Sequence, residues 1–284
     1  MASYIGHSFE RSRGNFSADD YKHFSTNITI LAKLASEKDL DDMADALSSL
    51  SAGAVASFNA KAQLPTRVAL LARRGRLDPV IAWLSRGGSF KVSGQLLLTE
   101  AVLSGDLALT TELLQRGANP NERASLASLS VLSFALRRQR VKLTQLLLEY
   151  SADANNVNTK SGVTPLMEAV MLRHEELISL LIEHGARVDV HDNKLENTPL
   201  MLATIPPENR YSTGSPPPES PKPLMLLLNA GANTELQNGR NMTALVNAVE
   251  RGLLEHVAGL IAAGARYRYS LPATSKMDFE VVGG

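Results

Sequence analysis

A glycine followed by alanine recurs at a nearly constant spacing, and this repeat constrains the fold more than any other feature of the chain. The endings and their close variants are, in chain order, Gly53-Ala54, Gly87-Gly88, Gly117-Ala118, Ser151-Ala152, Gly185-Ala186, Gly231-Ala232 and Gly264-Ala265. The successive steps are 34, 30, 34, 34, 46 and 33 residues. A period of this length predicts a stack of small structural repeats, each of which buries its apolar faces against its neighbours.

The segment 164–186 shows the pattern of one repeat most clearly. Thr164-Pro165 favours a helix start, because the threonine oxygen can accept a bond from a free backbone N–H and proline has no N–H to lose. A second amphipathic helix follows, with its apolar face at Leu177, Leu180 and Leu181. Gly185 can adopt the left-handed conformation that ends a helix. The pattern therefore predicts two short antiparallel helices.

Several copies share the opening Thr-Pro-Leu-x-x-Ala and the closing Leu-Leu-x-x-Gly-Ala. Together with the period, these motifs resemble the ankyrin repeat over residues 65–268. The resemblance implies an all-α, ankyrin-type helical solenoid of about six to seven helix-turn-helix repeats with short hairpin-like finger loops. Met167, Met201 or Val246 stands where the family has a histidine after Thr-Pro-Leu.

The ends of the chain are predicted to differ from the repeats. Residues 1–64 are expected to form a polar lead-in and a helical N-terminal cap. This cap is either a degenerate first repeat or an independent helical element that leans on the array. Residues 269–284 are expected to form a C-terminal tail.

A proline-rich insertion of about 205–223 interrupts one repeat after its first helix. Seven prolines in these 19 residues predict an extended loop, which a solenoid can accept without losing contacts between repeats. Ser215 and Ser220 each precede a proline and are candidate phosphorylation sites. Pro218-x-x-Pro221-Lys222 resembles an SH3-type ligand. Neutral expansion of the loop is the alternative.

The overall composition excludes several classes of protein. The 29 basic and 29 acidic residues cancel, so no net charge favours nucleic acid or a membrane surface. The absence of cysteine excludes disulfides and thiolate metal sites. No stretch approaches 18 uninterrupted apolar residues. These features predict an intracellular protein, cytoplasmic or nuclear.

Charge is nevertheless uneven, because two of the predicted inter-helix turns are rich in arginine. These arginines are Arg73, Arg74, Arg76, Arg137, Arg138 and Arg140. Stacking brings equivalent turns to one side, so they are predicted to form a basic edge that Asp106 interrupts. The edge is either a solvated set of helix ends or a docking site for an acidic or phosphorylated partner. Nucleic-acid binding there is less favoured, since no aromatic residues interleave.

The sequence contains no recognisable catalytic motif. Gly-x-Ser-x-Gly, Gly-x-Gly-x-x-Gly and His-Glu-x-x-His are all absent, and we predict no catalytic residue, metal site or cofactor. The alternative is a pathway enzyme, or an enzyme-associated protein, with an unrecognised active site on an ankyrin scaffold.

The resemblance instead implies a protein-binding surface on the finger loops and on the exposed faces of the first helices, which together form a concave groove. The residues predicted to contact a partner are Met167, Met171, Met201, Asn156, Asn158, His191, Asp192, Lys194, Asn238 and Arg240. The methionines fit a core role as an alternative. We therefore predict a non-catalytic adaptor or scaffold that is monomeric by itself and holds a protein partner of unspecified identity.

Overall fold

The computed structural model describes residues 40–42, 44–45, 63–92, 95–123, 129–205 and 220–267. The chain divides into an N-terminal unit, Met1–Asp153, and a C-terminal unit, Ala154–Gly284. The predicted lead-in, most of the predicted N-terminal cap, the tail at 269–284 and most of the proline-rich loop lie outside the described residues. No described helix is long and apolar enough to cross a membrane.

Each unit is built from consecutive helix pairs. The N-terminal unit contains α5 (Gln63–Arg73), α6 (Leu77–Ser85), α7 (Leu97–Ser104), α8 (Leu107–Gln115), α9 (Val131–Arg137) and α10 (Val141–Glu149). Its short antiparallel hairpin is formed by β1 (Lys91–Val92) and β2 (Gln95–Leu96). The C-terminal unit contains α11 (Pro165–Met171), α12 (Glu175–Glu183), α13 (Pro199–Ala203), α14 (Lys222–Asn229), α15 (Ala244–Glu250) and α16 (Leu254–Ala262).

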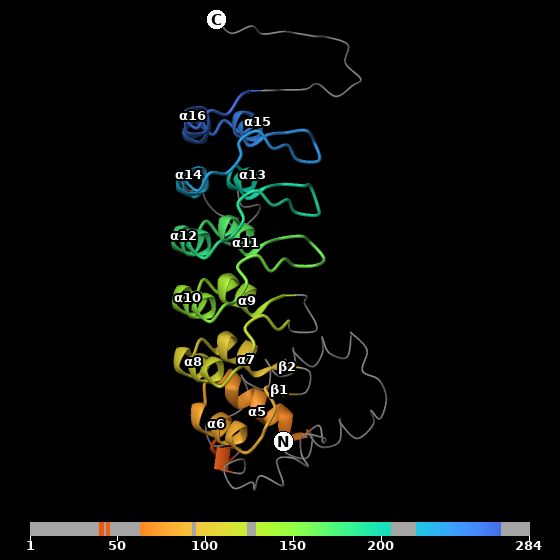
Figure 1. The fold of residues 1–284 in the computed structure, drawn as a ribbon, viewed down its shortest axis with the longest axis vertical. Helices are drawn as coiled ribbons and strands as arrows, with labels where there is room; N and C mark the ends of the chain where they lie inside the picture. The colour runs from red at the N-terminus through yellow and green to blue at the C-terminus, as the bar shows by residue number, and fades with distance from the viewer. Residues whose placement is uncertain are drawn as a thin grey trace, which may run out of the picture. The chain divides into compact units, whose positions relative to one another are not determined.

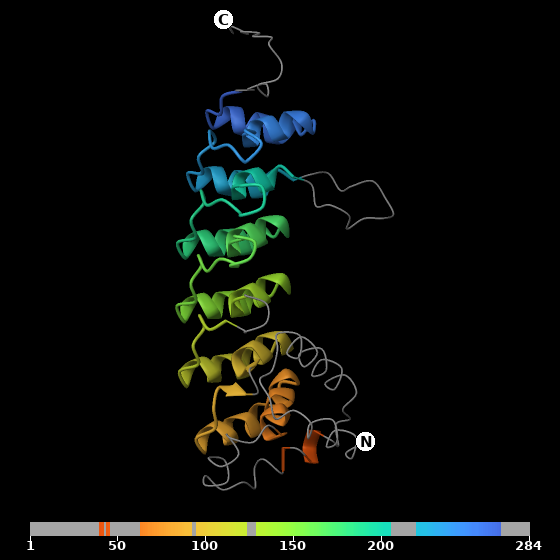
Figure 2. The same ribbon diagram turned by 90° about the vertical axis from the view of Figure 1, so that its right-hand side faces the viewer.

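The helices of the C-terminal unit form two layers, as Figure 1 shows, and Figure 2 shows the helix pairs following one another along the stack. The first helices of the repeats, α11, α13 and α15, pack on one another, and the second helices, α12, α14 and α16, form the other layer. In the N-terminal unit, α5, α7 and α9 pack in the same way, and α8 packs on α10. The predicted helical solenoid is confirmed within each unit.

The helix starts follow the chemistry of their first residues. The hydroxyls of Thr164, Thr198 and Thr243 each accept a bond from the backbone N–H three residues on, at 3.2, 3.3 and 3.3 Å. Pro165 and Pro199 occupy the first helical position, where no N–H is needed. The sequence motif thus places the start of α11, α13 and α15 correctly.

The core confirms most of the predicted apolar face of α12. Leu177 and Leu181 are fully buried. Ile178 is also fully buried, whereas Leu180 is only half-buried. The prediction for Leu180 is therefore wrong, because the buried stripe runs through Ile178 and Leu181 instead.

A ladder of four side-chain bonds links successive repeats among the described residues. Each acceptor stands three positions after the alanine of an ending, and the donor N–H belongs to the residue directly after the next ending. Asn121 Oδ1 accepts from Asp153 N at 2.7 Å, Asn155 Oδ1 from Arg187 N at 2.8 Å, Asp189 Oδ1 from Asn233 N at 2.9 Å, and Glu235 Oε1 from Arg266 N at 2.9 Å. Each bond satisfies a loop N–H and fixes the stacking register between neighbouring repeats.

Candidate functional site

The C-terminal unit presents three loops that each lead into a first helix. We call them finger 1 (155–163), finger 2 (189–197) and finger 3 (235–242), which precede α11, α13 and α15. All three project to the same side of this unit in Figure 1 and face the viewer in Figure 2. They are the hairpin-like finger loops predicted from the sequence.

One side chain in each finger shapes its turn by accepting backbone N–H groups. Asn158 Oδ1 accepts from Lys160 N at 3.0 Å and Ser161 N at 3.3 Å, Asp192 Oδ1 from Lys194 N at 2.9 Å and Leu195 N at 2.8 Å, and Asn238 Oδ1 from Arg240 N at 2.9 Å and Met242 N at 3.1 Å. Asn and Asp favour turns because their short side chains can reach these groups. Asp192 and Asn238 are buried, so both serve the finger scaffold.

Backbone bonds pin neighbouring fingers together. Asn193 N donates to Ser161 O at 2.9 Å between fingers 1 and 2, and Gly239 N donates to Leu195 O at 2.9 Å between fingers 2 and 3. Gly162, with φ of +68°, allows the first approach, because a Cβ there would lie 2.7 Å from the backbone nitrogen of Asn193. The three fingers therefore form one preordered surface.

The remaining finger residues predicted to contact a partner lie at different depths. Lys194 and Arg240 are exposed at the tips of fingers 2 and 3. Asn156, Asn158 and His191 are half-buried. Their role in binding remains a prediction, and the structure brings them together on one side of the C-terminal unit.

The methionines divide between core and surface. Met167 and Met201 are 0% and 1% exposed, so their predicted exposure is wrong and both belong to the core. Each lies at the third helical position, where the side chain folds back over the helix start. The Met167 sulfur accepts from Thr164 N at 3.5 Å, which places it against the cap. Met171, by contrast, is 42% exposed at the end of α11.

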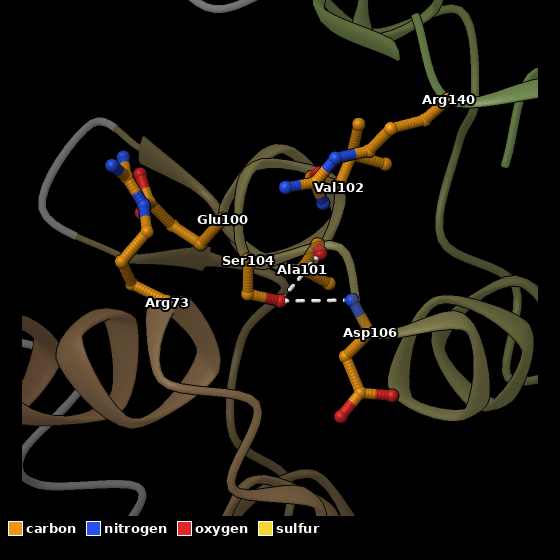
Figure 3. A network of polar contacts seen from close by, with 7 residues as sticks. All are labelled: Arg73, Glu100, Ala101, Val102, Ser104, Asp106 and Arg140. Carbon is orange, nitrogen blue, oxygen red and sulfur yellow. Dashed lines mark hydrogen bonds and ion pairs between the residues drawn. The ribbon is translucent and has the colours of Figure 1, made fainter. Parts of the chain in front are cut away.

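The basic edge of the N-terminal unit is partly neutralised, as Figure 3 shows. Arg73 forms an ion pair with Glu100, whose side chain is 3% exposed. Burial raises the pKa of Glu100, and the bond and charge of Arg73 offset part of that rise. Arg140 Nη1 donates to the carbonyl of Val102 at 3.0 Å and so caps the end of α7.

Three arginines of this edge, Arg73, Arg74 and Arg76, line an open hollow of about 520 Å³. Of these, Arg76 pairs with Asp41 at 3.1 Å. Asp106 lies at the same hollow and adds a carboxylate. At the next turn, Arg137 and Arg138 are exposed. The binding role of the basic edge remains a prediction, and several of its cations serve intramolecular bonds.

The two ends of the proline-rich insertion contact the turn between α11 and α12 and the first residue of α12. Arg173 donates to the carbonyls of Ala203 and Ile205 at 2.7 and 2.9 Å. On the far side, Lys222 Nζ lies 3.3 Å from a carboxylate oxygen of Glu175. The candidate phosphorylation site Ser220 is exposed, whereas Ser215 lies outside the described residues.

The described residues hold no group of three or more His, Cys, Asp or Glu side chains placed to bind a metal ion. The hollow at the basic edge is open and polar. A second open hollow of about 440 Å³ lies between α12 and α14, lined by Glu175, Lys222 and Met225 among others. What the geometry offers most clearly is a rigid, exposed surface on the fingers of the C-terminal unit.

Comparison with known proteins identifies the repeats. The family model for ankyrin repeats, which spans three copies, matches residues 98–192 and 132–211. The crystal structure of the ankyrin repeat domain of Bcl-3, a member of the IkappaB family, is similar with a TM-score of 0.59 and 26% identity, covering 70% of this chain and 86% of that one. The crystal structure of an ankyrin repeat domain, ABAYE2397 of Acinetobacter baumannii AYE, is similar with a TM-score of 0.62 and 26% identity. The match covers 70% of this chain and 98% of that one.

A third similar structure supports the fold alone. It contains the predatory endopeptidase Bd0816 of Bdellovibrio bacteriovorus in complex with the immunity protein Bd3460. Its TM-score is 0.56 at 19% identity, and the match covers 69% of this chain and 96% of that one. Among curated proteins, a sequence search found no match.

Proposed function

Because the chain belongs to the ankyrin-repeat family, we propose that it is a non-catalytic adaptor that holds a protein partner on the fingers and first helices of its C-terminal unit. Ankyrin repeats generally serve as protein–protein interaction modules. The fold alone does not assign a function, so the proposal depends on the surface that these repeats present.

The observation that carries the proposal is the pinning of the three fingers. Their turns are closed by Asn158, Asp192 and Asn238, and backbone bonds join each finger to the next. A partner that binds such a surface meets loops that are already ordered, so association loses less conformational entropy. Exposed Met171, at the C-terminal end of α11, adds an adaptable apolar contact on the first helices.

The test compares two exposed apolar side chains of the same unit. Partners are first captured with the wild-type chain from cells that express it and identified by mass spectrometry. The binding of the strongest partner is then measured by calorimetry for Met171→Glu and for the control Ile261→Glu, whose side chain is 58% exposed on α16. We expect Met171→Glu to weaken binding about tenfold or more while its thermal unfolding matches that of the wild type.

Two results would count against the adaptor. If no captured protein binds the purified chain directly, the function itself is wrong. Equal weakening by Met171→Glu and Ile261→Glu would mean that α11 and the fingers are not the binding surface.

A further inference from the structure

Three cationic side chains occupy the same position on successive fingertips. Lys160, Lys194 and Arg240 each stand two residues after the side chain that shapes their turn. Their backbone N–H groups bond to that side chain at 3.0, 2.9 and 2.9 Å, which fixes the backbone of each tip. All three side chains are exposed, and in the described structure none makes a hydrogen bond or ion pair. We call this set the fingertip row.

The spacing of the fingertip row is set by the stacking of the repeats. Backbone bonds hold Asn193 against Ser161 and Gly239 against Leu195, so the tips cannot move apart independently. Packed helices lie about 10 Å apart. A polypeptide in the extended polyproline II conformation advances about 3.1 Å per residue with three residues per turn, so every third side chain lies on one side of it and would meet a successive tip.

The carboxylates of the same fingers are mostly directed at the backbone. Asp189 and Glu235 each accept the N–H of the next repeat in the ladder, and Asp192 accepts two N–H groups inside its own turn. Glu196 of finger 2 is exposed and makes no such bond in the described structure. Among the described residues, the fingers therefore present three exposed cationic side chains without a hydrogen bond or ion pair, and one exposed carboxylate without either, that of Glu196.

We propose, on the basis of the adaptor function above, that the partner docks through an acidic segment in the extended polyproline II conformation, whose carboxylates recur at every third residue along the fingertip row. The recognised chemistry is a carboxylate side chain on each of three stacked tips. Glu196 lowers the affinity for such a segment and so limits binding to segments that satisfy all three cations.

The test uses the full chain and fluorescein-labelled peptides of about 12 residues, which is long enough to span three tips. The probes are (Gly-Ser-Glu)4, an isomer with its glutamates adjacent, and (Gly-Ser-Lys)4. Fluorescence anisotropy at low and physiological salt gives the affinities. We expect the spaced glutamate peptide to bind several-fold more tightly than its isomer, and the affinity to fall as salt rises.

The variants separate the fingertip row from overall charge. The triple variant K160E/K194E/R240E should lose at least about tenfold in affinity for (Gly-Ser-Glu)4, since each exposed pair contributes a few-fold. It should prefer the lysine peptide instead. The control K142E/R187E/R266E makes the same change of charge at exposed residues outside both the row and the basic edge, and should alter binding about twofold or less. Glu196→Gln should tighten binding.

Several outcomes would overturn the inference. Equal affinity for the two glutamate isomers would exclude the spacing, and equal loss in both triple variants would exclude the row. Tighter binding of a short single-stranded oligonucleotide than of the spaced peptide would assign the row to nucleic acid. If the captured partner binds K160E/K194E/R240E as well as the wild type, the inference fails while the adaptor function stands.

Discussion

Replacing Asn238 with alanine should destabilise finger 3, whereas replacing Arg240 at its tip should leave the stability of the fold unchanged. Asn238 makes three side-chain bonds. It accepts from the N–H groups of Arg240 and Met242 at 2.9 and 3.1 Å and donates to Asn197 Oδ1 at 2.9 Å. Arg240, in contrast, contributes only its backbone to this network.

The size of the effect follows from the burial of these groups. Each hydrogen bond contributes about 0.5–1.5 kcal/mol net to the free energy of unfolding. Removing the three bonds of Asn238 should therefore cost between about 1.5 and 4.5 kcal/mol. Water can reach the two loop N–H groups, but Asn197 is 3% exposed and would keep an unpaired oxygen. We therefore expect a loss of about 2–3 kcal/mol for Asn238→Ala and about 0.5 kcal/mol or less for Arg240→Ala.

Asn238→Asp provides the matched control. Aspartate keeps the acceptor for both N–H groups, as Asp192 does in finger 2, but cannot donate to Asn197. Its stability should fall between that of the wild type and that of Asn238→Ala.

Hydrogen exchange at the amides of Arg240 and Met242 is the direct assay, because repeats can open locally before the unit unfolds. Both amides should exchange faster in Asn238→Ala, and urea denaturation should show the loss of stability. The reasoning is refuted if protection is unchanged in Asn238→Ala. It is also refuted if Arg240→Ala costs as much stability as Asn238→Ala.

Three further perturbations test the core, the buried ion pair and the loop attachment. Leu181→Ala should lower the free energy of unfolding by about 2–5 kcal/mol, and half-buried Leu180→Ala by clearly less; equal shifts in urea would contradict the register of α12. Burial raises the pKa of Glu100, so its ionisation opposes folding, and wild-type stability should decline as pH rises above the ordinary glutamate range. Thermal unfolding of Glu100→Gln should lack this decline, and parallel pH curves would count against it. Arg173→Gln removes two bonds to carbonyls at the end of α13 and should speed amide exchange there, while unchanged exchange would show that the attachment is unimportant.

The sequence was sufficient for the repeats because their signals are local. Thr164-Pro165 and the closing Gly185 act through backbone groups within one turn, so the helix boundaries could be predicted without knowledge of the neighbours. The orientation of Met167 could not be predicted, since its burial depends on packing between repeats and not on groups within one turn. Apolar periodicity alone cannot distinguish a side chain at the third helical residue that packs between repeats from one that is exposed on the concave groove.

The inter-repeat ladder left a signal that periodicity analysis could have found. Asn121, Asn155, Asp189 and Glu235 all stand three residues after the alanine of an ending. A hydrogen-bond acceptor at the same position in four successive repeats indicates a structural bond, because the backbone N–H that it accepts also recurs at a fixed position. The same test applied to the fingers separates Asp192 and Asn238, which serve the scaffold, from their neighbours.

This separation explains why the fingertip row can carry specificity at little cost in stability. An Asn or Asp that closes a finger turn fixes the backbone two residues on, and the side chain at that position is then directed into solvent without a bond of its own. Exposed side chains of this kind change stability by about 0.5 kcal/mol or less when replaced. Lys194 and Arg240 can therefore be exchanged for other residues while the fingers keep their shape. Substitutions at the tips should therefore alter which partner binds, whereas substitutions at the Asn or Asp that closes each turn should alter the stability of the fingers.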